Sequence, residues 1–227
     1  MRQLTHHAPV FNPAIARVIP IGIYLLFLAT APWIEPYLPD GRWQYPIMVT
    51  CVAIALGILA PQFEELRGTL RINCQEWLSA VLVGVMVFVL WINLEQPWAS
   101  IGTPTGFDPR NPNGEVDYAL AALRIAGAAL VVPIMEELFW RSFIMRWIEQ
   151  TTFFTLHPGA VTWRGLVVSS VLFGVEHNLW LAGILAGLAY GGLYIRSGKL
   201  RSAIAAHAVT NFLLGSWVVY SSQWQFW

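Results

Sequence analysis

The sequence predicts an all-α protein, a polytopic transmembrane helical bundle of about seven spans (six to eight) with a polar site inside the bundle. Of its 227 residues, 56% are hydrophobic and only 11% are charged, whereas soluble domains carry about 25% charged residues. Apolar stretches of about 20 residues, the length that a helix needs to cross a bilayer, recur along the chain. The twelve tryptophans suit the aromatic belts found at membrane surfaces.

The first three predicted spans are apolar runs at residues 18–34, 45–61 and 76–94. The sequence before the first run is polar and interrupted by proline, and the run is not followed by a convincing small-residue cleavage site. We therefore expect the first run to stay in the mature protein as a spanning helix rather than to be removed as a signal peptide.

The remaining predicted spans are residues 118–147, 165–179, 180–195 and 201–220. The fifth and sixth are short and meet at the sequence HNLW, which predicts a tight helical hairpin within the protein. Residues 95–117, rich in Pro, Gly and Asn, are typical of an irregular loop outside the membrane. Because no soluble domain or internal repeat is evident, we predict one integral membrane domain, residues 1–227.

The distribution of Lys and Arg predicts the orientation, since these residues collect in cytoplasmic segments. With a cytoplasmic N-terminus, nine of them fall on the cytoplasmic side, two fall opposite, and Arg124 and Arg141 lie inside a span. We therefore expect a multi-pass protein of the cell membrane. The nine are Arg2, Arg17, Arg67, Arg71, Arg146, Arg164, Arg196, Lys199 and Arg201, and the two are Arg42 and Arg110.

The charge and the cysteine content limit the classes of partner and cofactor that we expect. The net charge is zero and there is no basic tract, which argues against nucleic acid and leaves membrane lipids as the expected surroundings. Cys51 and Cys74 form neither a disulfide framework nor a CxxC metal pair. We expect no cofactor and no metal.

Ionisable residues inside predicted spans point to a functional site, because they are costly in a membrane. Glu137 and Arg141, four residues apart, share a helix face, and we expect an ion pair that fixes helix packing. Glu136 is about 100° round the helix and is left free to face another helix. By contrast, Glu64 and Glu65 lie in a polar loop, where we expect solvated surface charges.

Three groups on separate predicted spans can reach the same depth. At about 1.5 Å per residue, Glu136 lies about 15 Å, His177 about 18 Å and His207 about 10 Å from the cytoplasmic helix ends, in the cytoplasmic half of the bilayer. A carboxylate and a histidine around one water form a general-base pair for hydrolysis. A second histidine and the amide of Asn211, four residues after His207, can stabilise an oxyanion. Attack by water is favoured because no serine or cysteine lies in a nucleophile elbow.

Three motifs resemble those of the CAAX protease and bacteriocin-processing (CPBP, or ABI) family. They are Glu136-Glu137-x-x-x-Arg141, Phe173-x-x-x-His177 and His207-x-x-x-Asn211. The resemblance implies a metal-independent intramembrane glutamic-type protease, with a catalytic core roughly at residues 118–220 of the bundle. It further implies that Glu136 and His177 activate the water, that His207 and Asn211 stabilise the oxyanion, and that Glu137 and Arg141 shape the site.

The size and tryptophan content resemble the exosortase-associated subgroup of CAAX-protease-related proteins. The expected substrate is a membrane-associated or lipidated protein or peptide. Two alternatives remain open. One is a zinc-dependent membrane peptidase with Glu136, His177 and His207 as ligands, although the chain has no HExxH helix. The other is a non-enzymatic membrane scaffold, immunity-type protein or transporter.

Overall fold

The computed structural model describes residues 11–67, 72–102 and 106–227. Within these ranges the regular structure is helical, and β pairing is limited to one isolated bridge between Arg110 and Val116. The predicted all-α class is therefore confirmed. Arg2 and Arg71, which contribute to the predicted charge bias, lie outside the described residues, as do residues 103–105 of the predicted loop.

Seven helical segments follow one another in the described part of the chain, as the sequence predicts. They are α1 (Pro13–Ile34), α2 (Gln44–Leu59), α3 (Cys74–Asn93), the continuous segment Tyr118–Trp147, α7 (Trp163–Val175), α8 (Trp180–Ser197) and α9 (Leu200–Ser221). The segment Tyr118–Trp147 comprises α4 (Tyr118–Ala126), α5 (Val132–Glu137) and α6 (Met145–Trp147), joined by π-helical turns at Gly127–Val131 and Leu138–Ile144. Short 3₁₀ turns lie at Glu35–Tyr37, Gly41–Trp43, Ala60–Gln62, Glu64–Leu66, Pro97–Ala99, Phe153–Thr155, Pro158–Ala160 and Trp224–Phe226.

Five stretches of the described chain are long and apolar enough to cross a membrane: Pro13–Tyr37, Gly41–Gln62, Cys74–Asn93, Tyr118–Trp147 and Leu200–Ser221. The other two helices, α7 and α8, pack against each other as the predicted hairpin. Glycines bring their backbones together, since a Cβ on Gly187 would lie 2.8 Å from the Ser170 Cα, and one on Gly183 would lie 2.8 Å from the Gly174 Cα. Such small residues are how helices approach closely in membranes.

Helix ends carry the expected capping residues. Asn73 and Glu76 form a reciprocal capping box at the start of α3. The Asn12 side chain caps α1 just before Pro13, and the Asp117 side chain accepts from the Leu120 N–H at the start of α4. Gly198 ends α8 in the left-handed conformation with φ 68°. These caps fix where α1, α3 and α4 begin and where α8 ends.

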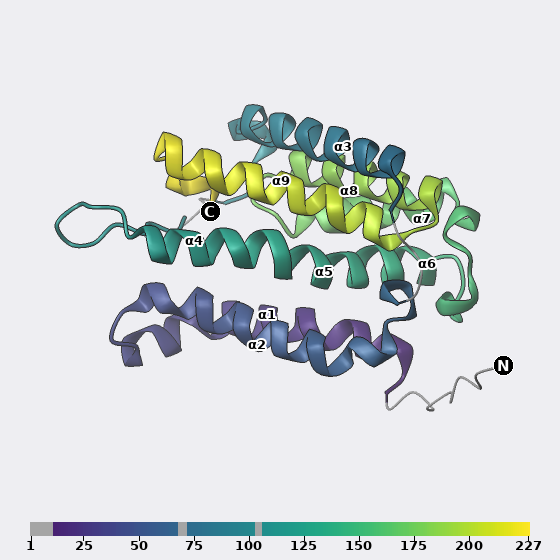
Figure 1. The fold of residues 1–227 in the computed structure, drawn as a ribbon, viewed down its shortest axis with the longest axis horizontal. Helices are drawn as coiled ribbons and strands as arrows, with labels where there is room; N and C mark the ends of the chain where they lie inside the picture. Colours follow the sequence, from purple (N-terminus) through teal and green to yellow (C-terminus); the bar gives the residue numbers. More distant parts are fainter. Residues whose placement is uncertain (1–10, 68–71, 103–105) are drawn as a thin grey trace.

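The segment Tyr118–Trp147 runs through the middle of the molecule (Figure 1). It lies between the α1–α2 pair on one side and the group formed by α3, α7, α8 and α9 on the other, and it contacts both. Large apolar side chains on the outer helix faces are exposed, among them Leu26, Ile58 and Leu130. An apolar outer face over many helices suits contact with lipid.

Exposed aromatic side chains gather at both ends of the helices, as the tryptophan content predicts for membrane belts. At the end where α1, α3 and α9 finish are Trp33, Tyr37, Trp43, Trp98, Tyr118 and Tyr220. At the end where these helices begin are Trp77, Trp147, Phe154 and Trp163.

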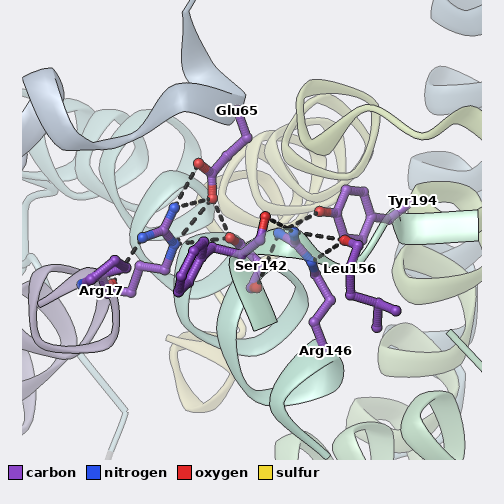
Figure 2. Close-up of polar contacts among 8 residues, drawn as sticks. Arg17, Glu65, Ser142, Arg146, Leu156 and Tyr194 are labelled. Atoms are coloured by element: carbon purple, nitrogen blue, oxygen red, sulfur yellow. Dashed lines mark hydrogen bonds and ion pairs between the residues drawn. The ribbon is translucent and has the colours of Figure 1, made fainter. Parts of the chain in front are cut away.

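The expectation for Glu65 is wrong, whereas Glu64 is exposed as expected. The Glu65 side chain is only 14% exposed, and both of its oxygens accept from Arg17 Nη2 at 2.7 Å (Figure 2). Ser142, on the π-helical turn of the central segment, donates to Glu65 and accepts from Arg17 Nε at 2.9 Å. Burial acts to raise the pKa of Glu65, but the Arg17 charge and these hydrogen bonds hold it below its ordinary value.

Candidate active site

Glu136 and Glu137 are the last two residues of α5, between the two π-helical turns of the central segment. π-helical turns are rare and recur at functional sites. The first one ends two residues before Pro133, whose ring would clash with the carbonyl four residues earlier in a regular α-helix. The widened turn therefore accommodates the proline and sets the direction in which the two glutamates enter the bundle.

Glu137 is fully buried, at 0% exposure, and contacts two groups at once. Its Oε2 lies 3.1 Å from Arg141 Nε, the ion pair that the four-residue spacing predicts. Its Oε1 lies 2.9 Å from His207 Nδ1 on α9, a contact that the spacing does not predict. Glu137 thus connects the arginine on its own helix to one of the two histidines.

Arg141 is buried against the aromatic faces of two neighbouring residues. Its guanidinium carbon lies 4.4 Å from the Phe173 ring centre and 5.4 Å from that of Tyr190. Its two terminal nitrogens are buried and have no hydrogen-bond acceptor among the described residues. The aromatic faces stabilise the cation where hydrogen-bond acceptors are missing. This stabilisation explains how a charged side chain with 2% exposure is tolerated.

Glu136 faces another helix, as its position round α5 predicts. Its carboxyl Oε2 lies 3.9 Å from His207 Nε2 and has no hydrogen-bond partner within the described ranges. This distance is too long for a direct hydrogen bond and suits two groups joined through one water molecule. A buried carboxyl group that borders a cavity without a fixed partner is a candidate for proton transfer.

His177 and His207 are each held through Nδ1, and this contact determines the role of the other ring nitrogen, Nε2. His177 Nδ1 lies 2.7 Å from the Phe173 carbonyl oxygen. Because a carbonyl oxygen only accepts, the hydrogen is on Nδ1, and Nε2 of the neutral ring carries the lone pair. The His177 ring packs edge-on against Trp91 at 5.4 Å, and the His207 ring stacks on Tyr190 at 4.9 Å.

Asn211 ties α9 to the first π-helical turn. Its Nδ2 donates to the Ala128 carbonyl at 2.8 Å. Within that turn the Val132 N–H bonds to the Gly127 carbonyl, so the Ala128 carbonyl would need an N–H from Pro133, which has none. The Asn211 amide supplies the missing donor and keeps a second N–H for another acceptor.

The four residues predicted to be catalytic line one cavity of about 200 Å³ inside the bundle, so the structure brings Glu136, His177, His207 and Asn211 together. The supporting pair Glu137–Arg141 lies beside the cavity, in contact with His207 and Tyr190. Within the described ranges, no three His, Cys, Asp or Glu side chains are gathered so that they could hold a metal ion.

Sequence reasoning assigned no role to other residues that line the cavity, among them Arg124, Tyr190, Trp91 and Thr210. Arg124 did carry a signal, since it is a charged residue inside a predicted span. Tyr190 donates to Thr210 Oγ1 at 2.7 Å, and Thr210 donates to the Gly84 carbonyl at 2.9 Å. Aromatic and hydroxyl residues are so common in this chain that their spacing carries no comparable signal.

Comparison with known proteins supports the resemblance that the three motifs predict. Residues 118–213 match the family model described as type II CAAX prenyl endopeptidase Rce1-like. No curated protein and no solved structure matches the chain. The matched segment is less than half of the chain, begins with α4 and contains all three motifs. The chain is therefore a multi-pass helical membrane protein whose segment 118–213 is similar to the Rce1-like CAAX endopeptidases, in agreement with the CPBP resemblance.

Proposed function

We propose that this protein is an intramembrane, metal-independent endopeptidase that hydrolyses a peptide bond in a membrane-associated or lipidated protein or peptide. One observation carries the proposal: four residues from two helical segments and the α7–α8 connection line the same cavity, namely Glu136, His177, His207 and Asn211. A family match to CAAX prenyl endopeptidases over the segment that holds these residues supports hydrolytic chemistry.

Glu136 and His177 activate the water in the proposed mechanism. The unprotonated Nε2 of His177 and the carboxylate of Glu136 both accept hydrogen bonds, so together they orient a water and take its proton as it attacks the carbonyl carbon. The same proton then passes to the leaving amine nitrogen when the C–N bond breaks. Proton and leaving group are balanced without any covalent intermediate.

His207 and Asn211 stabilise the oxyanion in this proposal. Glu137 holds His207 through Nδ1, so Nε2 faces the cavity beside Glu136. In its doubly protonated form His207 donates through both nitrogens, to Glu137 and to the oxyanion. The Asn211 N–H that is not bonded to the Ala128 carbonyl is the second donor.

Glu137 therefore has a larger proposed role than the ion pair alone. Its contact with His207 fixes the ring orientation, as a carboxylate does for the histidine of other hydrolytic sites. Arg141 holds Glu137 in place from the other side. We propose further that the single domain 1–227 has its core at 118–220, lies in the cell membrane with a cytoplasmic N-terminus, and acts in the cytoplasmic half of the bilayer.

A comparison of membrane peptides tests this function even while the substrate is unidentified. Cells that express wild type, Glu136→Gln, His177→Gln or the exposed-residue control Glu64→Gln are compared by mass spectrometry of membrane-protein termini. We expect new termini in cells with wild type and Glu64→Gln that are missing with the other two variants. The proposal is wrong if folded Glu136→Gln and His177→Gln proteins yield the wild-type set of termini.

A further inference from the structure

The cavity beside Glu136 extends along two helices. On the central segment its wall has residues four apart: Arg124, Ala128, Val132 and Glu136. On α9 the wall has the same spacing: His207, Asn211 and Gly215. Because residues four apart share a helix face, the cavity runs lengthwise between the two helices, from the proposed catalytic centre to Arg124.

Arg124 lies at the far end of this cavity within a group of aromatic rings. Its guanidinium carbon is 4.2 Å from the ring centre of Tyr45, 4.7 Å from that of Phe107 and 5.7 Å from that of Trp227. Its Nε is buried without a hydrogen-bond acceptor, and no carboxylate in the described part of the chain forms an ion pair with it. The rings stabilise a cation, but they leave its N–H donors to be satisfied by another molecule.

A carboxylate is the ligand that best fits these donors. The planar guanidinium presents parallel N–H groups that match the two oxygens of a carboxylate. Tyr24 and Tyr45 line the same cavity and can donate through their hydroxyl groups. The aromatic rings of Phe107 and Trp227 close round the guanidinium, which suits the end of a peptide better than a chain that must continue past it.

We propose that Arg124 binds the C-terminal carboxylate of the substrate peptide and so fixes the distance between the chain end and the hydrolysed bond. This inference rests on the proposed function. Arg124 and Glu136 are twelve residues apart on one helical segment, or about 18 Å along its axis. An extended peptide needs at least about five residues to cover this distance. The cavity of about 200 Å³ is smaller than the about 300–1,000 Å³ of most ligand pockets, which favours a tail close to this minimum length.

The test uses two pools of randomised hexapeptides, identical except that one ends in a free carboxylate and the other in an amide. The full chain is placed in lipid nanodiscs as the Glu136→Gln variant, so that binding is measured without hydrolysis. Retained peptides are quantified by mass spectrometry. We expect the carboxylate pool to be retained at least about tenfold better, and the additional change Arg124→Gln to bring the ratio close to one.

Two further variants control for folding and for charge. Arg124→Lys keeps the positive charge but loses the planar pair of donors, and we expect an intermediate ratio. Arg110 also lies near a tryptophan ring, at 6.0 Å from that of Trp224, but it is exposed and paired with Asp108. Arg110→Gln is therefore the matched control, and we expect it to keep the full preference for the carboxylate pool.

Several outcomes would overturn the inference. Equal retention of both pools by the Glu136→Gln protein rules out carboxylate recognition, and an unchanged preference after Arg124→Gln assigns it to another residue. Retention of amide peptides selected for Asp or Glu would identify a side-chain carboxylate as the ligand instead of the chain end. If wild type retains carboxylate peptides through Arg124 but hydrolyses neither pool, the Arg124 site is supported and the proposed protease function fails.

Discussion

Replacing Glu137 by Gln tests whether one buried carboxylate holds Arg141 and His207 together. The change keeps the shape of the side chain and removes the charge that faces Arg141 at 3.1 Å. Because Glu137 and Arg141 are 0% and 2% exposed, water cannot screen the charge that remains. Removal of one partner of such a pair costs about 3–5 kcal/mol.

The aromatic faces around Arg141 reduce this cost. Phe173 and Tyr190 lie 4.4 Å and 5.4 Å from the guanidinium carbon, and cation–π stabilisation amounts to about 2 kcal/mol at desolvated sites. We therefore expect Glu137→Gln to lower the free energy of unfolding by about 1–3 kcal/mol. The assay is SDS-titrated unfolding in mixed micelles, followed by tryptophan fluorescence.

A double variant separates the structural contribution of Glu137 from its proposed role in hydrolysis. Replacing both Glu137 and Arg141 by Leu removes the buried charges together, which restores most of the stability. It also removes the contact that orients His207, so we expect the stable double variant to lack peptide hydrolysis. The control is Asp40→Asn, which breaks a partly exposed pair with Arg42 and should cost much less stability. A Glu137→Gln protein as stable as this control would refute the reasoning.

Three further predictions follow from other contacts. Glu65→Gln should destabilise the protein at neutral pH because it leaves the buried Arg17 without its carboxylate partner. Since the folded pKa of Glu65 lies below its ordinary value of 4.5, the difference in unfolding free energy between the two proteins should shrink as the pH falls through the folded pKa, and pH-dependent unfolding of both proteins measures it. A difference that grows toward low pH would contradict this account. Asn211→Leu should cost about 1–3 kcal/mol because the Ala128 carbonyl loses its donor, which unfolding measurements detect. Treatment with a zinc chelator should leave peptide hydrolysis unchanged, and hydrolysis that returns only when zinc is added back would favour the zinc alternative.

The helical bundle is largely predictable because a long apolar run in a membrane satisfies its backbone hydrogen bonds within itself by forming a helix. The spans at 76–94, 118–147 and 201–220 all form helices close to their expected ends. The short α7–α8 hairpin is also predictable, from run length and the HNLW sequence. The π-helical turns could not be predicted, because hydropathy does not determine which carbonyl oxygen each backbone N–H bonds to. Pro133 is the residue that could have indicated the first of them.

Contacts between residues far apart in the sequence account for the other features that could not be predicted. Glu65 looked like a surface residue because its loop is polar, but its partner Arg17 is 48 residues away and brings it into the protein. The Glu137–His207 contact joins residues 70 apart, and the helix spacing that predicts the Glu137–Arg141 pair contains no information about it. The sequence predicts that Glu136, His177 and His207 lie at a similar depth in the membrane. The structure adds that all three line one cavity.

The most direct test of the account is the rate at which the purified full chain, in lipid nanodiscs, hydrolyses the randomised hexapeptide pool that ends in a carboxylate. We expect wild type to release fragments and Glu136→Gln to be slower by at least about 100-fold, because general-base catalysis contributes about 10²–10⁴ to such rates. Glu64→Gln should match wild type. A folded Glu136→Gln protein that hydrolyses the pool at the wild-type rate would contradict the central claim that Glu136 activates the water.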